Sequence, residues 1–190
     1  MEIRNVCVFC GSNMGNDPIF AQKAEELALL LAERHINLVY GAGDRGLMGK
    51  IALMMKNHGS QVIGISPKRF AKHNEHSFPL DEYVEVDTMH QRKELMYEKS
   101  DAFLALPGGC GTLEELAEIF TWRQLGYHGK PVVLYNISHF YDHLVAQMNS
   151  MVVQGFMQPA QMAMMHISED AEDIMAYLEA FVREQGKWEK

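Results

Sequence analysis

The sequence predicts an α/β fold, in which a doubly wound and mainly parallel sheet carries helices on both faces. Short apolar runs rich in β-branched residues alternate along the chain with segments of helical periodicity. A glycine-bearing turn follows three of these runs, where a strand would pass into a helix. Such alternation forms parallel β-α-β units with right-handed crossovers. No linker, repeat or low-complexity segment interrupts it, so we expect one domain over residues 1–190.

The expected elements follow from these runs in chain order. Five strands are expected at the apolar, β-branched runs: residues 6–11, 36–41, 61–67, 101–106 and 131–136. Helices are expected at the segments with an apolar stripe: residues 17 or 18 to about 34, 46–59, 88–99, 112–125 and one from about 139. Residues 164–181 add one short strand and a closing helix. Residues 68–83 are polar and are expected to form an irregular active-site loop.

The overall composition excludes several classes of protein. The chain is 47% hydrophobic and 22% charged, which is ordinary for a globular domain. Its formal net charge of -8 argues against a nucleic-acid partner. No apolar stretch approaches the roughly 18 residues that cross a bilayer, and the N-terminal residues lack the pattern of a signal peptide. We therefore expect no membrane partner and a cytoplasmic location.

The cysteines and histidines do not suggest a metal or redox site. Cys7 and Cys10 are three residues apart on an expected strand, so their side chains point to opposite faces. That placement argues against a redox pair or half of a zinc site. His139 and His143 lie four apart on an expected helix, but no third ligand is evident nearby. We expect solvated histidines and no metal.

Three glycine-bearing turns fall at the expected carboxyl ends of strands, where open α/β sheets bind their ligands. They are CGSNMG at residues 10–15, GAGDRGLMG at residues 41–49 and PGGCGT at residues 107–112. Backbone amides at a helix start attract a phosphate, and the Thr112 hydroxyl adds a donor. The alternative is a tight turn in which Thr112 and Glu115 form a capping box. Both interpretations remain open on this stretch alone.

Other motifs narrow the chemistry. No Gly-Lys-Ser/Thr follows the glycines, so the loop is not a Walker A motif, and no G-x-S-x-G occurs. Residues 41–46 match G-x-G-x-x-G, but the next strand lacks the acidic residue of dinucleotide-binding proteins. Arg92 and Lys93 follow a Thr88-x-x-Gln91 capping box, early in a helix where cations are disfavoured. They are either ligand-binding residues or solvated surface cations.

Taken together, CVFCGS, LVYGAGDRGLMG, MHQRK and PGGCGTLEE resemble the LONELY GUY family, from about Val6 to about Leu144. Members are cytokinin riboside 5'-monophosphate phosphoribohydrolases, long labelled lysine decarboxylases. The family pattern P-G-G-x-G-T-x-x-E is matched fully by residues 107–115, and the R-K pair by residues 92 and 93. Ala42 replaces the middle glycine of the usual G-G-G. Residues 68–83 align poorly, which leaves Glu75 doubtful as the family's ribose contact.

The resemblance implies a Rossmann-like homodimer that hydrolyses the N-glycosidic bond of an AMP-like nucleoside 5'-monophosphate. It implies catalytic roles for Arg92 and Glu115, and no metal or organic cofactor. The phosphate would lie on the glycine loop, and Thr121 would lie near the substrate. The substrate-binding residues expected on this basis are Arg92, Lys93, Gly108, Gly109, Cys110, Gly111, Thr112, Leu113, Glu114 and Thr121.

Two other functions remain open at this stage. A non-catalytic carrier of a nucleotide or nucleotide-like cofactor on the same fold would bind tightly without turnover. An oxidoreductase that uses the turn at residues 41–49 would bind a nicotinamide cofactor. Amino-acid decarboxylation usually requires an electron sink such as pyridoxal phosphate on a Schiff-base lysine. The sequence shows no S-x-H-K-like site for one.

Overall fold

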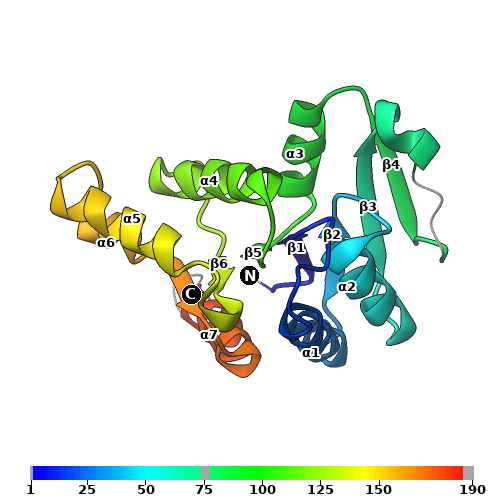
Figure 1. The fold of residues 1–190 in the computed structure, drawn as a ribbon, viewed down its shortest axis with the longest axis horizontal. Helices are drawn as coiled ribbons and strands as arrows, with labels where there is room; N and C mark the ends of the chain where they lie inside the picture. The colour runs from blue at the N-terminus through cyan, green and yellow to red at the C-terminus, as the bar shows by residue number, and fades with distance from the viewer. Residues whose placement is uncertain (1, 74–77, 186–190) are drawn as a thin grey trace.

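The computed structural model describes residues 2–73 and 78–185, and in that part the chain folds around one seven-stranded parallel sheet (Figure 1). The strands are β1 Asn5–Phe9, β2 Asn37–Tyr40, β3 Val62–Pro67, β4 Glu82–Val86, β5 Ala102–Ala105, β6 Val132–Tyr135 and β7 Met165–Ser168. Their order across the sheet is β4-β3-β2-β1-β5-β6-β7. Glu75 lies outside the described residues. The predicted α/β class with a parallel sheet is confirmed.

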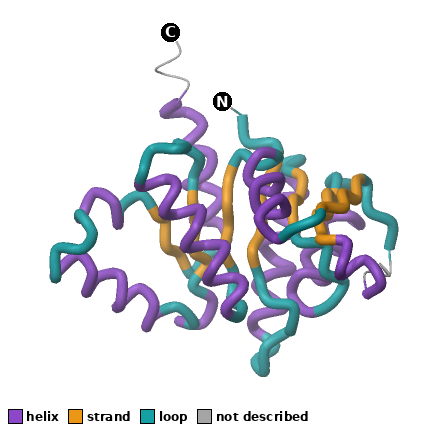
Figure 2. Tube along the Cα trace, turned by 90° about the horizontal axis from the view of Figure 1, so that it is seen from above, coloured by secondary structure: helices purple, strands orange, loops and turns teal. Residues whose placement is uncertain are grey.

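Helices cover both faces of this sheet. The α-helices are α1 Ile19–Glu33, α2 Gly46–Asn57, α3 Met89–Glu98, α4 Cys110–Gln124, α5 Asp142–Val153, α6 Pro159–Met162 and α7 Ala171–Gln185. Two 3-10 helices are η1 Lys68–His73 and η2 Ile137–His139. Figure 2 shows the strands side by side between helices. Within the described ranges, no helix is long and apolar enough to cross a membrane.

Two separate cores hold the layers together. Helices α1, α2 and α7 pack on one face, where Leu31, Leu38 and Leu104 are fully buried. Helices α3, α4 and α5 pack on the other, around Phe103 and Ile65. Strands buried on both faces are near-continuous apolar runs, which is why they were recognisable in the sequence.

The two N-terminal cysteines illustrate this alternation. Cys7 belongs to the core under α3 and α4, whereas Cys10 belongs to the core under α1 and α2. The prediction that their side chains point to opposite faces is confirmed, and both are unpaired buried thiols.

The segment after β3 differs from its prediction. Residues 68–83 were expected to form one irregular loop, but η1 occupies its start and β4 begins at Glu82. Strand β4 pairs in parallel with β3 at the edge of the sheet, and its burial alternates between exposed and half-buried residues. An edge strand with one solvated face has no continuous apolar run, so this strand was missed.

The strand order also fixes where a ligand can bind. Strands β2 to β4 are added on one side of β1 and β5 to β7 on the other, so the order of the strands reverses between β1 and β5. In doubly wound sheets this switch point opens a crevice outside the carboxyl ends of the strands. The turns that follow β1, β2 and β5 all lie at that edge, as predicted.

Candidate active site

The three glycine-bearing turns pack against one another. The Gly11 amide donates to the Pro107 carbonyl at 3.0 Å, and the Met48 amide donates to the Gly11 carbonyl at 3.3 Å. Gly46 has a φ of +63°, and a Cβ atom there would lie 2.3 Å from the Ser12 carbonyl carbon. Glycine is therefore required at position 46, both by its backbone conformation and by the close approach of the first turn.

These turns surround a cavity of about 350 Å³. It is lined by the end of β1, by the three turns and by side chains of α3 and α4, including Ser12, Met48, Arg92, Met96 and Glu115. A volume of this size suits a small organic ligand.

The floor of the cavity is the start of α4, which no side chain caps. The helix begins at Cys110 with Gly109 as its N-cap residue. Of the two interpretations left open for this stretch, the capping box at Thr112 and Glu115 is wrong, because the helix starts two residues earlier and Thr112 lies inside its first turn. Uncapped amides at a helix start, with the positive end of the helix dipole, form an anion site.

The glycines of this loop have different tasks. A Cβ atom at Gly109 or Gly111 would meet no atom within 4 Å, so both positions face open space and leave the amides accessible. A Cβ atom at Gly108 would lie 2.1 Å from Thr112 Oγ1. Gly108 is thus required for packing of the loop on the buried Thr112.

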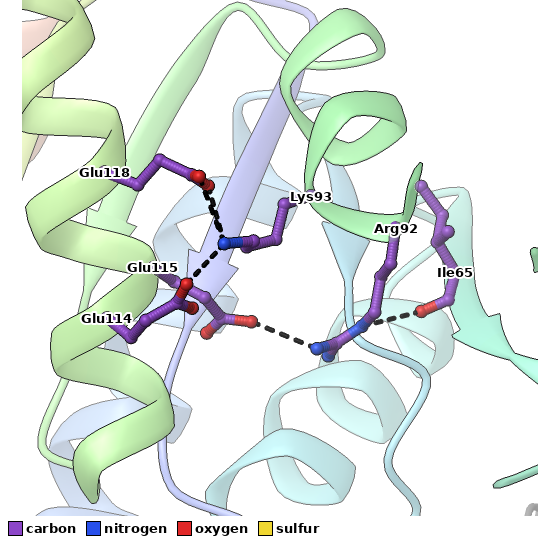
Figure 3. A network of polar contacts seen from close by, with 6 residues as sticks. All are labelled: Ile65, Arg92, Lys93, Glu114, Glu115 and Glu118. Carbon is purple, nitrogen blue, oxygen red and sulfur yellow. Dashed lines mark hydrogen bonds and ion pairs between the residues drawn. The ribbon is translucent and has the colours of Figure 1, made fainter. Parts of the chain in front are cut away.

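The cavity is also lined by Arg92 of α3 and Glu115 of α4, which form an ion pair (Figure 3). Arg92 Nη1 donates to Glu115 Oε1 at 3.2 Å, and Arg92 Nε donates to the Ile65 carbonyl at 3.1 Å. Only 12% and 11% of the two side chains are exposed. The position of Arg92 early in α3 is thus explained by its tertiary partners.

Burial and charge act in opposite directions on Glu115. Burial raises the pKa of its carboxyl group, the neighbouring Arg92 cation lowers it, and Glu114 raises it again. The net result is a raised pKa. A carboxylate that is desolvated yet held beside one cation is typical of catalytic sites.

Lys93 serves a different purpose from Arg92. Its ammonium group lies between Glu114 and Glu118 of α4, with Nζ 3.0 Å from Glu118 Oε2, and only 10% of the side chain is exposed. Burial lowers the pKa of Lys93, but the hydrogen bonds to the two carboxylates outweigh it and raise the pKa. Lys93 and Glu114 therefore join α3 to α4 beside the cavity and do not line it.

Three other expected residues also lie outside this cavity. Thr121 lines a separate groove between α3 and α4, beside Trp122, and Leu113 is exposed on the first turn of α4. Gly108 borders a neighbouring cavity with Met14 and Phe140. The cavity unites Arg92, Gly109, Cys110, Gly111, Thr112 and Glu115.

The structure adds residues that sequence reasoning missed. Met48 and Met96 line the cavity, and Ser12 and Gly41 come from the first two turns. The turns themselves were recognised by their glycines. Met96 lies one helical turn after Arg92, and this spacing was the available signal for it.

The histidines lie apart from this cavity. His139 belongs to η2, and its Nδ1 atom lies 3.1 Å from Glu169 Oε1 and 3.4 Å from Asp142 Oδ2. His143 lies in α5. The helix expected from about residue 139 starts at Asp142. Within residues 2–73 and 78–185, no group of three or more His, Cys, Asp or Glu side chains is arranged to hold a metal ion.

Solved structures with similar folds include the molybdenum cofactor binding protein of Rippkaea orientalis, with a TM-score of 0.72 and 21% identity. That comparison covers 96% of this chain and 99% of the other. The structure of the molybdenum cofactor carrier protein of Chlamydomonas reinhardtii has a TM-score of 0.71 and 18% identity. This comparison also covers 96% of this chain and 99% of the other. At these identities the similarity establishes the fold alone.

Sequence comparison is more specific. The family model described as "Possible lysine decarboxylase" matches residues 48–178. The chain is 44% identical to cytokinin riboside 5'-monophosphate phosphoribohydrolase LOG2 of Arabidopsis thaliana, over 95% of this chain and 85% of that protein. It is 42% identical to "Probable cytokinin riboside 5'-monophosphate phosphoribohydrolase LOGL9" of Oryza sativa subsp. japonica, over 95% of this chain and 80% of that protein. With the P-G-G-x-G-T-x-x-E loop forming the floor of its cavity, the chain belongs to the LONELY GUY family.

Proposed function

We propose that this protein hydrolyses the N-glycosidic bond of nucleoside 5'-monophosphates, which gives a free base and ribose 5-phosphate. The observation that carries the proposal is the buried Arg92–Glu115 pair in the same cavity as the uncapped start of α4. The names of the relatives support the same reaction. An AMP-like nucleotide is the substrate we propose.

The 5'-phosphate binds the amides of Gly109, Cys110, Gly111 and Thr112. No side chain caps this helix start, so an anion completes the hydrogen bonding that a cap residue would supply. Phosphate binding then fixes the ribose beside Glu115, which lies about one helical turn further along α4. Binding energy from this remote group positions the reacting bond.

Cleavage of the bond between C1' and the base nitrogen leaves positive charge on the sugar and negative charge on the base. The ionised Glu115 stabilises the cationic sugar and accepts a proton from the attacking water. The water oxygen bonds to C1', and the electron pair of the broken bond leaves with the base, which then takes up a proton. Arg92 is a fixed cation that stabilises the departing base or the sugar hydroxyls.

Lys93 and Glu114, expected as substrate contacts, support the site by joining α3 to α4. The decarboxylase description fits this arrangement poorly. A Schiff-base lysine must reach a free, unprotonated state, whereas Lys93 is held between Glu114 and Glu118 with a raised pKa. Neither Arg92 nor Glu115 requires a metal or organic cofactor for its role.

We also propose that the protein is a homodimer that works in the cytoplasm. The groove between α3 and α4 has a volume of about 520 Å³, and Leu125 and Tyr127 at its rim are 66% and 72% exposed. Exposed apolar side chains around a groove are typical of interfaces. Three unpaired cysteines are typical of a reducing compartment. Light scattering should give a dimer mass, and Leu125→Lys should lower it; a monomeric parent protein would contradict the dimer.

The activity is tested by incubating the protein with AMP and with adenosine and measuring free adenine. We expect adenine and ribose 5-phosphate from AMP, and a kcat/KM for adenosine that is lower by on the order of 10²-fold or more. Equal kcat/KM values would remove the phosphate site from the mechanism. Tight binding of AMP without adenine release would instead identify a carrier.

A further inference from the structure

The guanidinium group of Arg92 is held on three sides. Its Nε donates to the Ile65 carbonyl of β3, and its Nη1 donates to Glu115 of α4. On the third side, Nη2 lies against the backbone of Gly41, the residue directly after β2, which also lines the cavity. The first two contacts are visible in Figure 3.

The contact with Gly41 leaves no room for a side chain. A Cβ atom at position 41 would lie 1.5 Å from Arg92 Nη2 and 2.7 Å from Arg92 Cζ. Both distances are far below van der Waals contact between heavy atoms, about 3.5–4.0 Å. An alanine at this position and the observed position of Arg92 therefore exclude each other.

The backbone itself does not demand glycine at position 41. The glycines with positive φ are Gly15, Gly46, Gly59, Gly126 and Gly155, and Gly41 is not among them. Gly41 is therefore outside the left-handed region that favours glycine. The close approach of Arg92 is therefore what requires a glycine here.

We propose that Gly41 is a positioning residue for Arg92, and this inference rests on the proposed hydrolase function. The absence of a side chain lets the guanidinium lie between Gly41, the Ile65 carbonyl and Glu115. A methyl group would displace the cation from the Ile65 carbonyl and from Glu115. A displacement of about 1 Å in such a site lowers the rate by on the order of 10²-fold.

Gly43 offers a matched control in the same turn. A Cβ atom at Gly43 would lie 3.0 Å from Met48 Cε, the same distance as a Cβ atom at Gly41. At position 43 the three nearest atoms all belong to the Met48 side chain, the third at 3.6 Å, so no atom of Arg92 would lie closer than that. Gly43→Ala therefore reproduces the crowding of Met48 without the collision with Arg92.

The test measures AMP hydrolysis, its pH profile and the melting temperature for Gly41→Ala, Gly43→Ala, Arg92→Ala and the double variant Gly41→Ala/Arg92→Ala. Gly41→Ala should lower kcat on the order of 10²-fold, while binding of ribose 5-phosphate to the α4 amides changes little. The acid limb of its pH profile should move upward, because Glu115 loses the cation that lowers its pKa. Gly43→Ala should stay within a few-fold of the parent protein.

The double variant separates positioning from general damage. With Arg92 truncated, the collision with the guanidinium is removed and only the crowding of Met48 remains, so Gly41→Ala should then lower the melting temperature no more than Gly43→Ala does. If Gly41→Ala alone does not fold but the double variant does, the inference is supported. Full kcat in Gly41→Ala, or an equal loss of stability with and without Arg92, would overturn it. A parent protein that releases no adenine would refute the proposed hydrolase activity. The melting temperatures of the parent protein, the two single variants and the double variant would still test the contact between Gly41 and Arg92.

Discussion

At the scale of single residues, the ionisation of Glu115 decides both activity and a part of the stability. Burial raises the pKa of this carboxyl group despite the neighbouring Arg92 cation. The ionised form is the one that stabilises a cationic sugar. Turnover should therefore fall as the pH drops through a value above the ordinary pKa of glutamate. A pH profile of kcat checks this, and an acid limb at or below the ordinary value would contradict it.

The same raised pKa predicts how stability depends on pH. A group whose pKa is higher in the folded protein contributes stability below its unfolded pKa, and this contribution is lost as the pH rises through the folded value. Glu115→Gln cannot ionise and lacks this dependence. The melting temperature of Glu115→Gln should therefore rise relative to the parent protein between the unfolded and folded pKa values. A relative fall over that interval, measured by differential scanning calorimetry, would show that Arg92 dominates over burial.

Cys110 tests whether backbone amides bind the phosphate. Its thiol is exposed and unpaired on the first residue of α4. We expect Cys110→Ala to retain kcat/KM within a few-fold, because the amide is kept. Cys110→Pro removes that N–H in addition to the thiol, at a position where proline suits a helix start, so comparison with Cys110→Ala isolates the amide. The proline variant should keep its melting temperature but raise KM for AMP roughly 10- to 100-fold, the range for a hydrogen bond to a charged group.

The contrary results for Cys110 are equally clear. Near-complete loss of turnover in a folded Cys110→Ala variant would make the thiol a nucleophile. An unchanged KM for AMP in Cys110→Pro would exclude the amide of residue 110 from the phosphate site.

At the scale of elements, the alignment of α3 with α4 places Arg92 opposite Glu115. Lys93 of α3 connects the two helices, because its ammonium group donates hydrogen bonds to Glu114 and Glu118 of α4. Lys93→Met keeps the apolar stem but removes the cation, and leaves two carboxylates facing each other. We expect a loss of about 1–3 kcal/mol in unfolding free energy, together with lower kcat. Chemical denaturation and AMP turnover measure the two effects.

Lys99, the C-cap residue of the same helix α3, supplies the matched control. It pairs with Glu82 at 2.9 Å, and both side chains are more exposed than Lys93. A surface ion pair contributes about 0–1 kcal/mol, so Lys99→Met should change stability by less than that and leave kcat intact. Equal effects of the two substitutions would mean that Lys93 has no special role in aligning the helices.

The sequence predicted the elements that follow a simple period. The buried strands and the helices α1 to α4 were expected within a few residues of their bounds. Strand β4 was missed because an edge strand needs no apolar run. The start of α4 was misplaced because Thr112 and Glu115 have the spacing of a capping box. Glu115 instead pairs with Arg92, 23 residues away in sequence, and no local pattern encodes such a contact.

At the scale of the whole molecule, the parallel sheet determines which of its edges can bind a ligand. All strands are parallel, so the turns after β1, β2 and β5 meet at their carboxyl ends. That rule alone predicted the location of the cavity from the glycines. It could not predict that Lys93 would pair with Glu118 or that Thr121 would line a different groove, because helix rotation and tilt decide those contacts.

The hydrolase mechanism predicts that Glu115 acts by its charge, and the most direct measurement is single-turnover release of adenine from AMP by the parent protein and by Glu115→Gln. The glutamine keeps the shape and a hydrogen bond to Arg92 but loses the charge. We expect adenine from the parent protein and a rate lower by on the order of 10²-fold or more in the variant, with the fold intact by melting temperature. Near-normal release by Glu115→Gln would contradict the mechanism.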